Sequence, residues 1–277
     1  MASLLIFIKE ASHYSLKALE VYNSIGQVEF EKALNQSLIN VLVVRLGYKI
    51  DKFFLQNYPN LQYILSPTTG LDHIDIKHCN KEGIRVLSLN DIKKDIENVS
   101  STAELSLGLI VSLIRKIPQA SNSVLFDRKW DRDKFRTRQL SNMSIGIIGV
   151  GRIGTMVAKY SNAMGMKVFG FDTEKGKKHF DDNNIQQLDL KDLLACADII
   201  SIHASSTPEN THLLNKQNLS SLKKGTYLIN TARGNLVCEE SIIELLDANI
   251  LYGYAADVID GELDKENFNS VIFQNMK

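Results

Sequence analysis

Short apolar runs alternate with segments of helical periodicity along most of the chain. Glycine, asparagine and aspartate break the chain between the runs of the first third. Alternation of this kind is typical of parallel sheets covered by helices, so the sequence predicts an α/β fold of the doubly wound type. The expected strands are residues 4–8, 41–45, 63–65, 85–87, 144–149, 167–172, 198–203, 226–230 and 253–258.

A sharp helix signal lies near residue 100. Ser101 and Glu104 have the Ser-x-x-Glu spacing of a helix capping box. We expect this helix to run to about residue 116 and to be closed by Pro118. The boundary between two domains is placed at its start, which gives domains of residues 1–99 and 100–277. The apolar stripe of the helix is Leu105, Leu109, Ile110, Leu113 and Ile114.

A glycine-rich motif follows the expected strand that opens the second half of the chain. Gly149, Gly151 and Gly154 form a GxGxxG, with Arg152 and Ile153 inside it. Because the motif stands between a strand and a helix, it predicts a dinucleotide-binding turn. The first glycine permits the tight turn, the second lets the backbone approach a pyrophosphate, and the third allows the helix to pack closely on the strand. A glycine-rich turn without a ligand is the alternative.

An acidic residue ends the next expected strand. Asp172 follows Gly149 by 23 positions. Its carboxylate is expected to accept hydrogen bonds from the adenosine ribose hydroxyls and to repel a 2′-phosphate, so NAD is favoured over NADP. Lys175, Lys177 and Lys178 follow shortly and would weaken that preference.

Composition narrows the class of protein. Of the 277 residues, 44% are hydrophobic and 23% are charged, and 32 basic residues balance 32 acidic ones. These values are typical of a globular protein and exclude disorder, collagen and coiled coil. A formal net charge of zero offers no general field for nucleic acid or an anionic membrane, so neither is an expected partner.

Cysteine usage favours a reducing location. Cys79, Cys196 and Cys238 are far apart and form no CxxC pair and no metal-ligand spacing. A disulfide scaffold and a metal site are therefore not expected, and the cytoplasm is the expected location. The apolar run at residues 4–8 is too short for a signal peptide or a membrane span.

Several motifs occur in one order along most of the chain. They are Thr69-Gly-Leu-Asp-His-Ile-Asp75, Ala103-Glu104, Trp130, the spacing from Gly149 to Asp172, Ser201-Ile-His203 with Thr207-Pro-Glu209, Leu228-Ile-Asn-Thr-Ala-Arg-Gly234, and Ala256-Asp257-Val258 followed by Glu262. Together they resemble the D-isomer-specific 2-hydroxyacid dehydrogenases. The resemblance implies a Rossmann-type cofactor domain and a smaller, flavodoxin-like α/β substrate domain, with the site in the cleft between them.

The resemblance also implies a substrate site. Arg233 would bind the substrate carboxylate and polarise the carbonyl, while Thr69, Gly70 and Leu71 would offer backbone N–H groups to the same carboxylate. Glu262 would be the acidic partner of a catalytic histidine. Independently of the resemblance, a planar guanidinium can hold a carboxylate bidentately. The alternatives are a surface salt bridge for Arg233 and a solvated loop carboxylate for Glu262.

For the nicotinamide, the resemblance implies a second set of residues. Asp257 would hold the carboxamide, and Thr102, Ala232 and His203 would lie along the ring. His203 is more simply interpreted as a packed structural histidine than as a proton donor. Members of the family are commonly homodimers joined through the cofactor domain, and residues 120–138 are the expected arm.

Two functions of different classes stay open. The first is an NAD-dependent oxidoreductase that interconverts a 2-oxo acid and a D-2-hydroxy acid by hydride transfer. The second is a non-catalytic NAD(H)-responsive binding protein of the same fold. The family takes its proton from a histidine in a Pro-His turn downstream of the glutamate, and the fifteen residues after Glu262 contain no histidine. We therefore expect the sequence to be truncated. A short-chain reductase is disfavoured because no Tyr-x-x-x-Lys pair stands at a comparable place.

Overall fold

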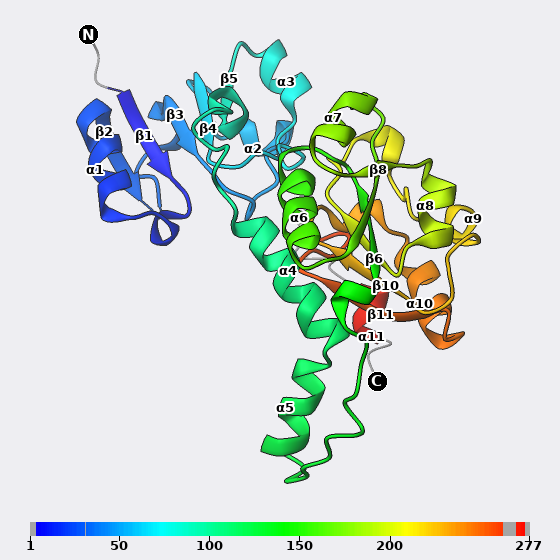
Figure 1. The fold of residues 1–277 in the computed structure, drawn as a ribbon. Coiled ribbons are helices and arrows are strands. Elements are labelled where there is room, and N and C mark those ends of the chain that lie inside the picture. Colours follow the sequence, from blue (N-terminus) through cyan, green and yellow to red (C-terminus); the bar gives the residue numbers. More distant parts are fainter. Residues whose placement is uncertain (1–3, 31, 263–269, 275–277) are drawn as a thin grey trace. The chain divides into compact units, whose positions relative to one another are not determined.

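The computed structural model describes residues 4–30, 32–262 and 270–274, which form two compact units (Figure 1). The first unit extends to Asn98, and the second begins at Val99. Each unit has a parallel sheet and apolar clusters of its own. Within the described residues, no helix is long and apolar enough to cross a bilayer.

The first unit has a flavodoxin-like sheet. Its elements are β1 (Leu4–Ile8), α1 (Leu16–Ile25), β2 (Gly26–Phe30), β3 (Val41–Val43), α2 (Lys52–Leu55), β4 (Tyr63–Ser66), α3 (Ile76–Lys81) and β5 (Arg85–Ser88). The paired strands run parallel in the order β2-β1-β3-β4-β5. This is the strand order of flavodoxin-like domains, so the fold expected for the smaller domain is confirmed.

Alternate strand residues of the first unit face opposite layers. Phe7 and Leu42 pack in the cluster that contains residues of α2 and α3, whereas Ile6 and Val43 pack against α1. The apolar pattern did not predict β2, because its sequence Gly-Gln-Val-Glu-Phe is polar at alternate positions. An edge strand with one neighbour tolerates such a sequence, and β2 pairs with β1 along its whole length.

The second unit has the strand order of a dinucleotide-binding fold. Its strands are β6 (Ser144–Ile148), β7 (Lys167–Phe171), β8 (Gln186–Gln187), β9 (Ile199–Ile202), β10 (Thr226–Asn230) and β11 (Leu251–Ala256), and its helices are α4 (Ser101–Ile114), α5 (Ile117–Leu125), α6 (Arg152–Ala163), α7 (Lys177–Asp182), α8 (Leu190–Cys196), α9 (Lys216–Leu219), α10 (Glu239–Asp247) and α11 (Val271–Gln274). The parallel order is β11-β10-β9-β6-β7-β8. The order reverses between β6 and β9, and ligands of such sheets bind outside the strand ends at that reversal. The expected Rossmann-type fold is confirmed.

Two helical layers cover this sheet. Ile145 and Ile147 of β6 pack with α4 and α6, while Ile148 of the same strand and Ile200 of β9 pack with α8 and α10. Because neighbouring residues of a strand point to opposite faces, one apolar run packs against the helices on both faces of the sheet. Figure 1 shows α5 and the segment returning to β6 extending away from the rest of this unit.

The boundary helix differs from its prediction in two respects. The capping box expected at Ser101 is wrong: α4 begins at Ser101, no side chain caps it, and the Ser100 hydroxyl donates instead to the Glu104 carboxylate. Pro118 does not close the helix but lies in the first turn of α5, after a left-handed residue at Lys116. Proline is tolerated there because first-turn N–H groups have no intrahelical acceptor.

A buried carboxylate ties distant segments of the second unit together. Asp198 accepts hydrogen bonds from the Ser144 N–H at 2.9 Å, the Lys223 ammonium at 2.8 Å and the Arg138 guanidinium at 3.1 Å. Burial opposes its ionisation, but Lys223, Ser144 and Arg138 outweigh burial and lower the pKa of Asp198 to about 2.

We expect Asp198→Asn to lower the free energy of unfolding by an amount on the order of 2 kcal/mol at neutral pH. Since the native pKa lies below the ordinary value of 3.8, the contribution is complete above that value and is lost as the pH falls towards about 2. Urea unfolding of both proteins at several pH values measures this. The control Asp133→Asn removes an exposed carboxylate paired with Arg136 and should change stability little. A difference between Asp198→Asn and the parent that does not shrink in acid would contradict this assignment.

Candidate functional site

The glycine-rich loop after β6 forms a cradle at the sheet reversal. Gly149 has a φ of +89°, and a Cβ there would lie 2.5 Å from the Ala204 nitrogen beyond β9. A Cβ at Gly154 would collide with the Gly149 carbonyl. At Gly151, by contrast, nothing lies within 4 Å of the position that a Cβ would occupy. The first and third glycines are therefore required by packing, whereas the second leaves backbone open to an approaching group.

Helix α6 points its N-terminal end at this cradle. Gly151 is its N-cap, and no side chain caps the helix. The first N–H groups of a helix lack intrahelical acceptors and favour an anion. The Arg152 side chain donates to the Val99 carbonyl, and Ile153 packs against the apolar core. The residues present therefore fit a dinucleotide pyrophosphate.

Asp172 follows β7 directly and faces the same loop. Its carboxylate accepts hydrogen bonds from the Val150 N–H at 2.7 Å, the Glu174 N–H at 2.8 Å and the Lys175 N–H at 3.1 Å. An ionised carboxylate has about four acceptor sites, so these contacts hold it in place and leave it capable of accepting from a ribose hydroxyl.

We expect Asp172→Ala to raise the NADH dissociation constant about 10- to 100-fold while improving NADPH binding relative to NADH. The substitution removes a charged acceptor and its repulsion of a 2′-phosphate. The matched variant Asp172→Asn keeps an acceptor for the Val150 N–H but lacks the charge. Fluorescence titration of all three proteins with both cofactors measures the effect, and an unchanged NADH/NADPH ratio would refute this role.

The segments after β9 and within α4 lie close to the loop that follows β10. His203 comes directly after β9, and its Nε2 lies 2.8 Å from the Ser201 hydroxyl. Burial lowers the pKa of His203 to about 4, so the ring is neutral near physiological pH. In α4 the Ser106 hydroxyl bonds to the carbonyl of Thr102 and lies 2.7 Å from the Thr231 hydroxyl.

The turn after β10 carries Arg233. The buried Asn230 side chain shapes the turn, since its Oδ1 accepts from the Ala232 N–H at 3.1 Å and its Nδ2 donates to the Arg233 carbonyl at 2.9 Å. The Arg233 guanidinium in turn donates to the Ala232 carbonyl at 2.6 Å. A buried side chain amide thus fixes the backbone from which Arg233 projects.

Asp257, which directly follows β11, contacts the turn after β10. Its N–H donates to the Asn230 carbonyl at 3.3 Å. Partial burial raises the pKa of Asp257, and its backbone hydrogen bond and the Arg233 guanidinium oppose that rise. A Cβ at Gly234 would collide with the backbone of Ile259 and Asp260. The turn after β10 and the loop after β11 therefore pack backbone against backbone, with no side chain between them. The structure therefore brings Arg233 and Asp257 together.

Glu262 lies in the exposed end of the loop after β11. Its N–H donates to the Ile259 carbonyl, and its carboxylate accepts from the Ile259 N–H, both at 3.3 Å. The sequence did not single out Glu239, whose buried carboxylate accepts from the Asp260 N–H at 3.3 Å and from the Ser270 hydroxyl at 2.7 Å. A glutamate in the first turn of a helix is explained by its favourable interaction with the helix dipole. The local sequence therefore gives no sign that Glu239 binds this loop.

The predicted anion-binding residues of the first unit lie in the turn after β4. The Thr68 hydroxyl donates to the Gly70 carbonyl at 2.8 Å, and the Asn90 amide donates to the Thr69 carbonyl at 2.6 Å. Among the described residues, no protein group accepts from the N–H of Gly70 or Leu71. The turn is thus held through the carbonyl oxygens of Thr69 and Gly70.

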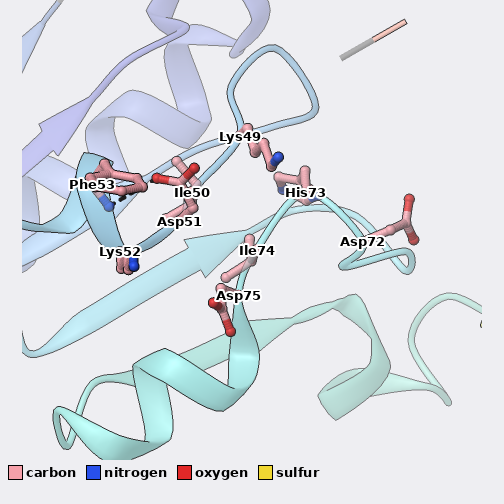
Figure 2. Close-up of a pocket in the computed structure, with 9 residues that line it drawn as sticks. All are labelled: Lys49, Ile50, Asp51, Lys52, Phe53, Asp72, His73, Ile74 and Asp75. Atoms are coloured by element: carbon pink, nitrogen blue, oxygen red, sulfur yellow. Dashed lines mark hydrogen bonds between the residues drawn. The ribbon is translucent and has the colours of Figure 1, made fainter. Parts of the chain in front are cut away.

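A cavity of about 480 Å³ lies beside this turn, within the first unit (Figure 2). Its lining residues are Lys49, Ile50, Asp51, Lys52, Phe53, Asp72, His73, Ile74 and Asp75. Asp51 and Asp75 already cap α2 and α3, and the His73 ring lies 3.4 Å from the Ser66 hydroxyl. Two of its three carboxylates therefore have structural roles, and none of the predicted site residues lines it.

The fold and the glycine-rich cradle define the second unit as a dinucleotide-binding domain. The sequence profile of the "D-isomer specific 2-hydroxyacid dehydrogenase, NAD binding domain" matches residues 107–275. The chain belongs to this family, and the expected family and NAD cofactor are confirmed.

Relatives and solved structures agree with this assignment. The chain is 31% identical over 258 residues to D-3-phosphoglycerate dehydrogenase of Methanocaldococcus jannaschii, covering 90% of this chain and 48% of that protein. It is 32% identical to hydroxypyruvate reductase of Thermotoga maritima, covering 81% of this chain and 70% of the reductase. The crystal structure of D-lactate dehydrogenase from Aquifex aeolicus with NAD and lactic acid superposes with a TM-score of 0.82 at 27% identity, covering 93% of this chain and 78% of that one. The chain spans about half the length of the phosphoglycerate dehydrogenases it matches.

Proposed function

We propose that this protein is an NAD-dependent oxidoreductase that interconverts a 2-oxo acid and a D-2-hydroxy acid by hydride transfer. The observation that carries the proposal is Arg233, held by Asn230 directly after β10 and electrostatically coupled to Asp257. A guanidinium that projects from a restrained backbone turn suits a small anionic substrate, because it can bind a carboxylate bidentately and draw charge from an adjacent carbonyl.

Within the second unit, the cofactor contacts divide between the two ends of the dinucleotide. The N–H groups at Gly151, Arg152 and Ile153 bind the pyrophosphate, and Asp172 binds the adenosine ribose. At the other end, Asp257 holds the carboxamide, and the bound NAD supplies or accepts the hydride. The nicotinamide neighbours are Thr102, His203 and Ala232. Gly149 and Gly154 shape the loop.

Substrate orientation is the task of two further segments. Arg233 binds the substrate carboxylate and polarises the carbonyl. In the first unit, the backbone N–H groups of Thr69, Gly70 and Leu71 are the proposed donors to a substrate carboxylate. The carboxylate of Glu262 would accept a hydrogen bond from a histidine and stabilise the protonated form of that histidine during proton transfer. The roles of Arg233 and of the turn after β4 rest on the restraint of the Arg233 backbone and on the N–H groups of Gly70 and Leu71, from which no described protein group accepts; the role of Glu262 rests on the family resemblance alone.

A panel of 2-oxo acids with NADH tests the activity. The first members of the panel are hydroxypyruvate, pyruvate and 3-phosphohydroxypyruvate. Chiral analysis of the product checks the D configuration. We expect at least one to be reduced to the D-2-hydroxy acid. The panel is run on this chain and on a version extended through the family's Pro-His turn. Tight NADH binding without turnover of any member by either version would instead favour a non-catalytic NAD(H)-responsive binding protein.

We further propose a cytoplasmic enzyme, because the three cysteines all lie in the described residues and are free thiols. Nucleic acid and membranes are not among its proposed partners. A homodimer joined through the cofactor domain is supported by the expected arm, residues 120–138, where Phe126 is 76% and Trp130 is 80% exposed. Large aromatic side chains in such a position are typical of an interface.

We expect Phe126→Glu combined with Trp130→Glu to convert a dimer into a monomer, because the buried charges would lack partners. Sedimentation equilibrium measures the mass. The control Phe53→Glu places the same charge at an exposed phenylalanine of the first unit and should leave the mass unchanged. A mass that is the same for the double variant and the parent would exclude this arm as the interface.

A further inference from the structure

The peptide groups on both sides of Val150 are held by side chains from outside the glycine-rich loop. The Val150 N–H donates to the Asp172 carboxylate at 2.7 Å. Its carbonyl lies 2.9 Å from Nε2 of His179, a residue of α7 that the motifs do not include. The same nitrogen lies 3.2 Å from the Thr155 hydroxyl, which makes a longer contact of 3.5 Å to the Val150 carbonyl. Val150 itself is fully buried between Gly149 and Gly151.

Peptide geometry gives these two contacts a directional consequence. The Val150 carbonyl and the Gly151 N–H belong to one planar trans peptide unit and point in opposite directions. A partner that holds the carbonyl therefore also fixes where the N–H points. Glycine has wide φ and ψ freedom, and no protein atom lies near the Cβ position of Gly151, so local sterics do not supply this restraint.

We propose that His179 is a positioning residue for the cofactor: by holding the Val150 carbonyl, it orients the Gly151 N–H towards the dinucleotide pyrophosphate. The proposal deepens the proposed function and rests on it, because it needs this loop to bind a dinucleotide. Asp172 has the matching role one peptide earlier, since it holds the unit that joins Gly149 and Val150.

His179 is well placed for this task. The next residue, Phe180, is fully buried in the core cluster of β6 and α6, which anchors the short helix α7. The Asn183 amide donates to the His179 carbonyl at 2.8 Å and restrains the end of that helix. A histidine ring protonated at Nε2 donates to a carbonyl in both its neutral and its charged form, so the contact does not require a charge.

Binding of NADH to the cofactor-free protein tests the proposal without recourse to catalysis. We expect His179→Ala to raise the NADH dissociation constant about tenfold, the effect of one lost restraint. His179→Gln retains an N–H donor and should recover most of the affinity. The matched control His78→Ala removes a histidine of α3 in the first unit and should bind NADH like the parent. Hydrogen exchange over residues 149–153 should be faster in His179→Ala than in the parent.

The outcomes separate a positioning role from a purely structural one. Parent-like NADH affinity and exchange in His179→Ala would overturn the proposal. The proposal would also be overturned if both variants bound NADH weakly and both had a lowered melting temperature. That result would show only that α7 has lost its anchor. If the unaltered protein does not bind NADH, the proposed function itself fails, and the proposal with it.

Discussion

Lysine in place of Arg233 should lower kcat/KM for a 2-oxo acid about a hundredfold and leave the NADH dissociation constant within about twofold. Lysine keeps the positive charge but loses the planar fork that holds a carboxylate at two points and polarises the neighbouring carbonyl. A hundredfold loss corresponds to about 3 kcal/mol of transition-state stabilisation, the range of a charged hydrogen bond. Steady-state kinetics and NADH titration of the same preparations measure both quantities.

Arg85→Lys is the matched control for this experiment, because Arg85 is an exposed arginine of β5 outside the proposed site. It should change neither kcat/KM nor NADH binding. If Arg233→Lys lowers kcat/KM by less than threefold, less than about 1 kcal/mol has been lost, and the carboxylate contact is wrong. Equal losses in turnover and NADH binding would instead indicate a disturbed cofactor loop.

Alanine in place of Gly234 should lower the melting temperature by roughly 6–12 °C and weaken NADH binding about tenfold. The added methyl would collide with the backbone of Ile259 and Asp260, which cannot rotate away as a flexible side chain does. Overpacking of this kind costs about 3 kcal/mol. Relief requires the loop after β11 to move, and that loop carries Asp257 and Glu262. Thermal melting and NADH titration measure the two effects.

Gly108→Ala distinguishes this collision from a general effect of replacing glycine. Gly108 lies inside α4, and nothing stands within 4 Å of the position of its Cβ. Alanine there should raise the melting temperature by roughly 2 °C, because it favours the helix and meets no neighbour. A Gly234→Ala protein that melts and binds NADH like the parent would show that the two loops are not held together as described.

Local sequence patterns were sufficient for most of the fold. Buried parallel strands favour runs of mostly apolar residues. β1, β6 and β9 have such runs, so the local sequence predicts their positions. β2 escaped prediction because an edge strand needs only alternate apolar residues. The start of α4 was predicted wrongly because Ser101 and Glu104 have the spacing of a capping box, whereas in the structure Ser101 is already helical and no side chain caps the helix.

The glycine-rich loop was recognisable from the sequence for a related reason. Gly149, Gly151 and Gly154 act through backbone conformation and close approach, which their type and spacing reveal. Asp172 is recognisable from its place after the next strand. The roles of Arg233, Asp257 and Glu262 came from the resemblance, and they stay predictions until the variants are measured.

By itself, the sequence determined the α/β class, the family and the dinucleotide motif, because each depends on residue types at short, regular spacings. Only the tertiary structure decided which distant polar groups hold that motif and the other segments of the second unit in place. His179 reaches Val150 across 29 positions, Asp198 reaches Ser144 across 54, and Glu239 reaches Ser270 across 31. Such contacts leave no local pattern, because a polar side chain finds its partner only after the strands and helices have packed and excluded water from the space between them.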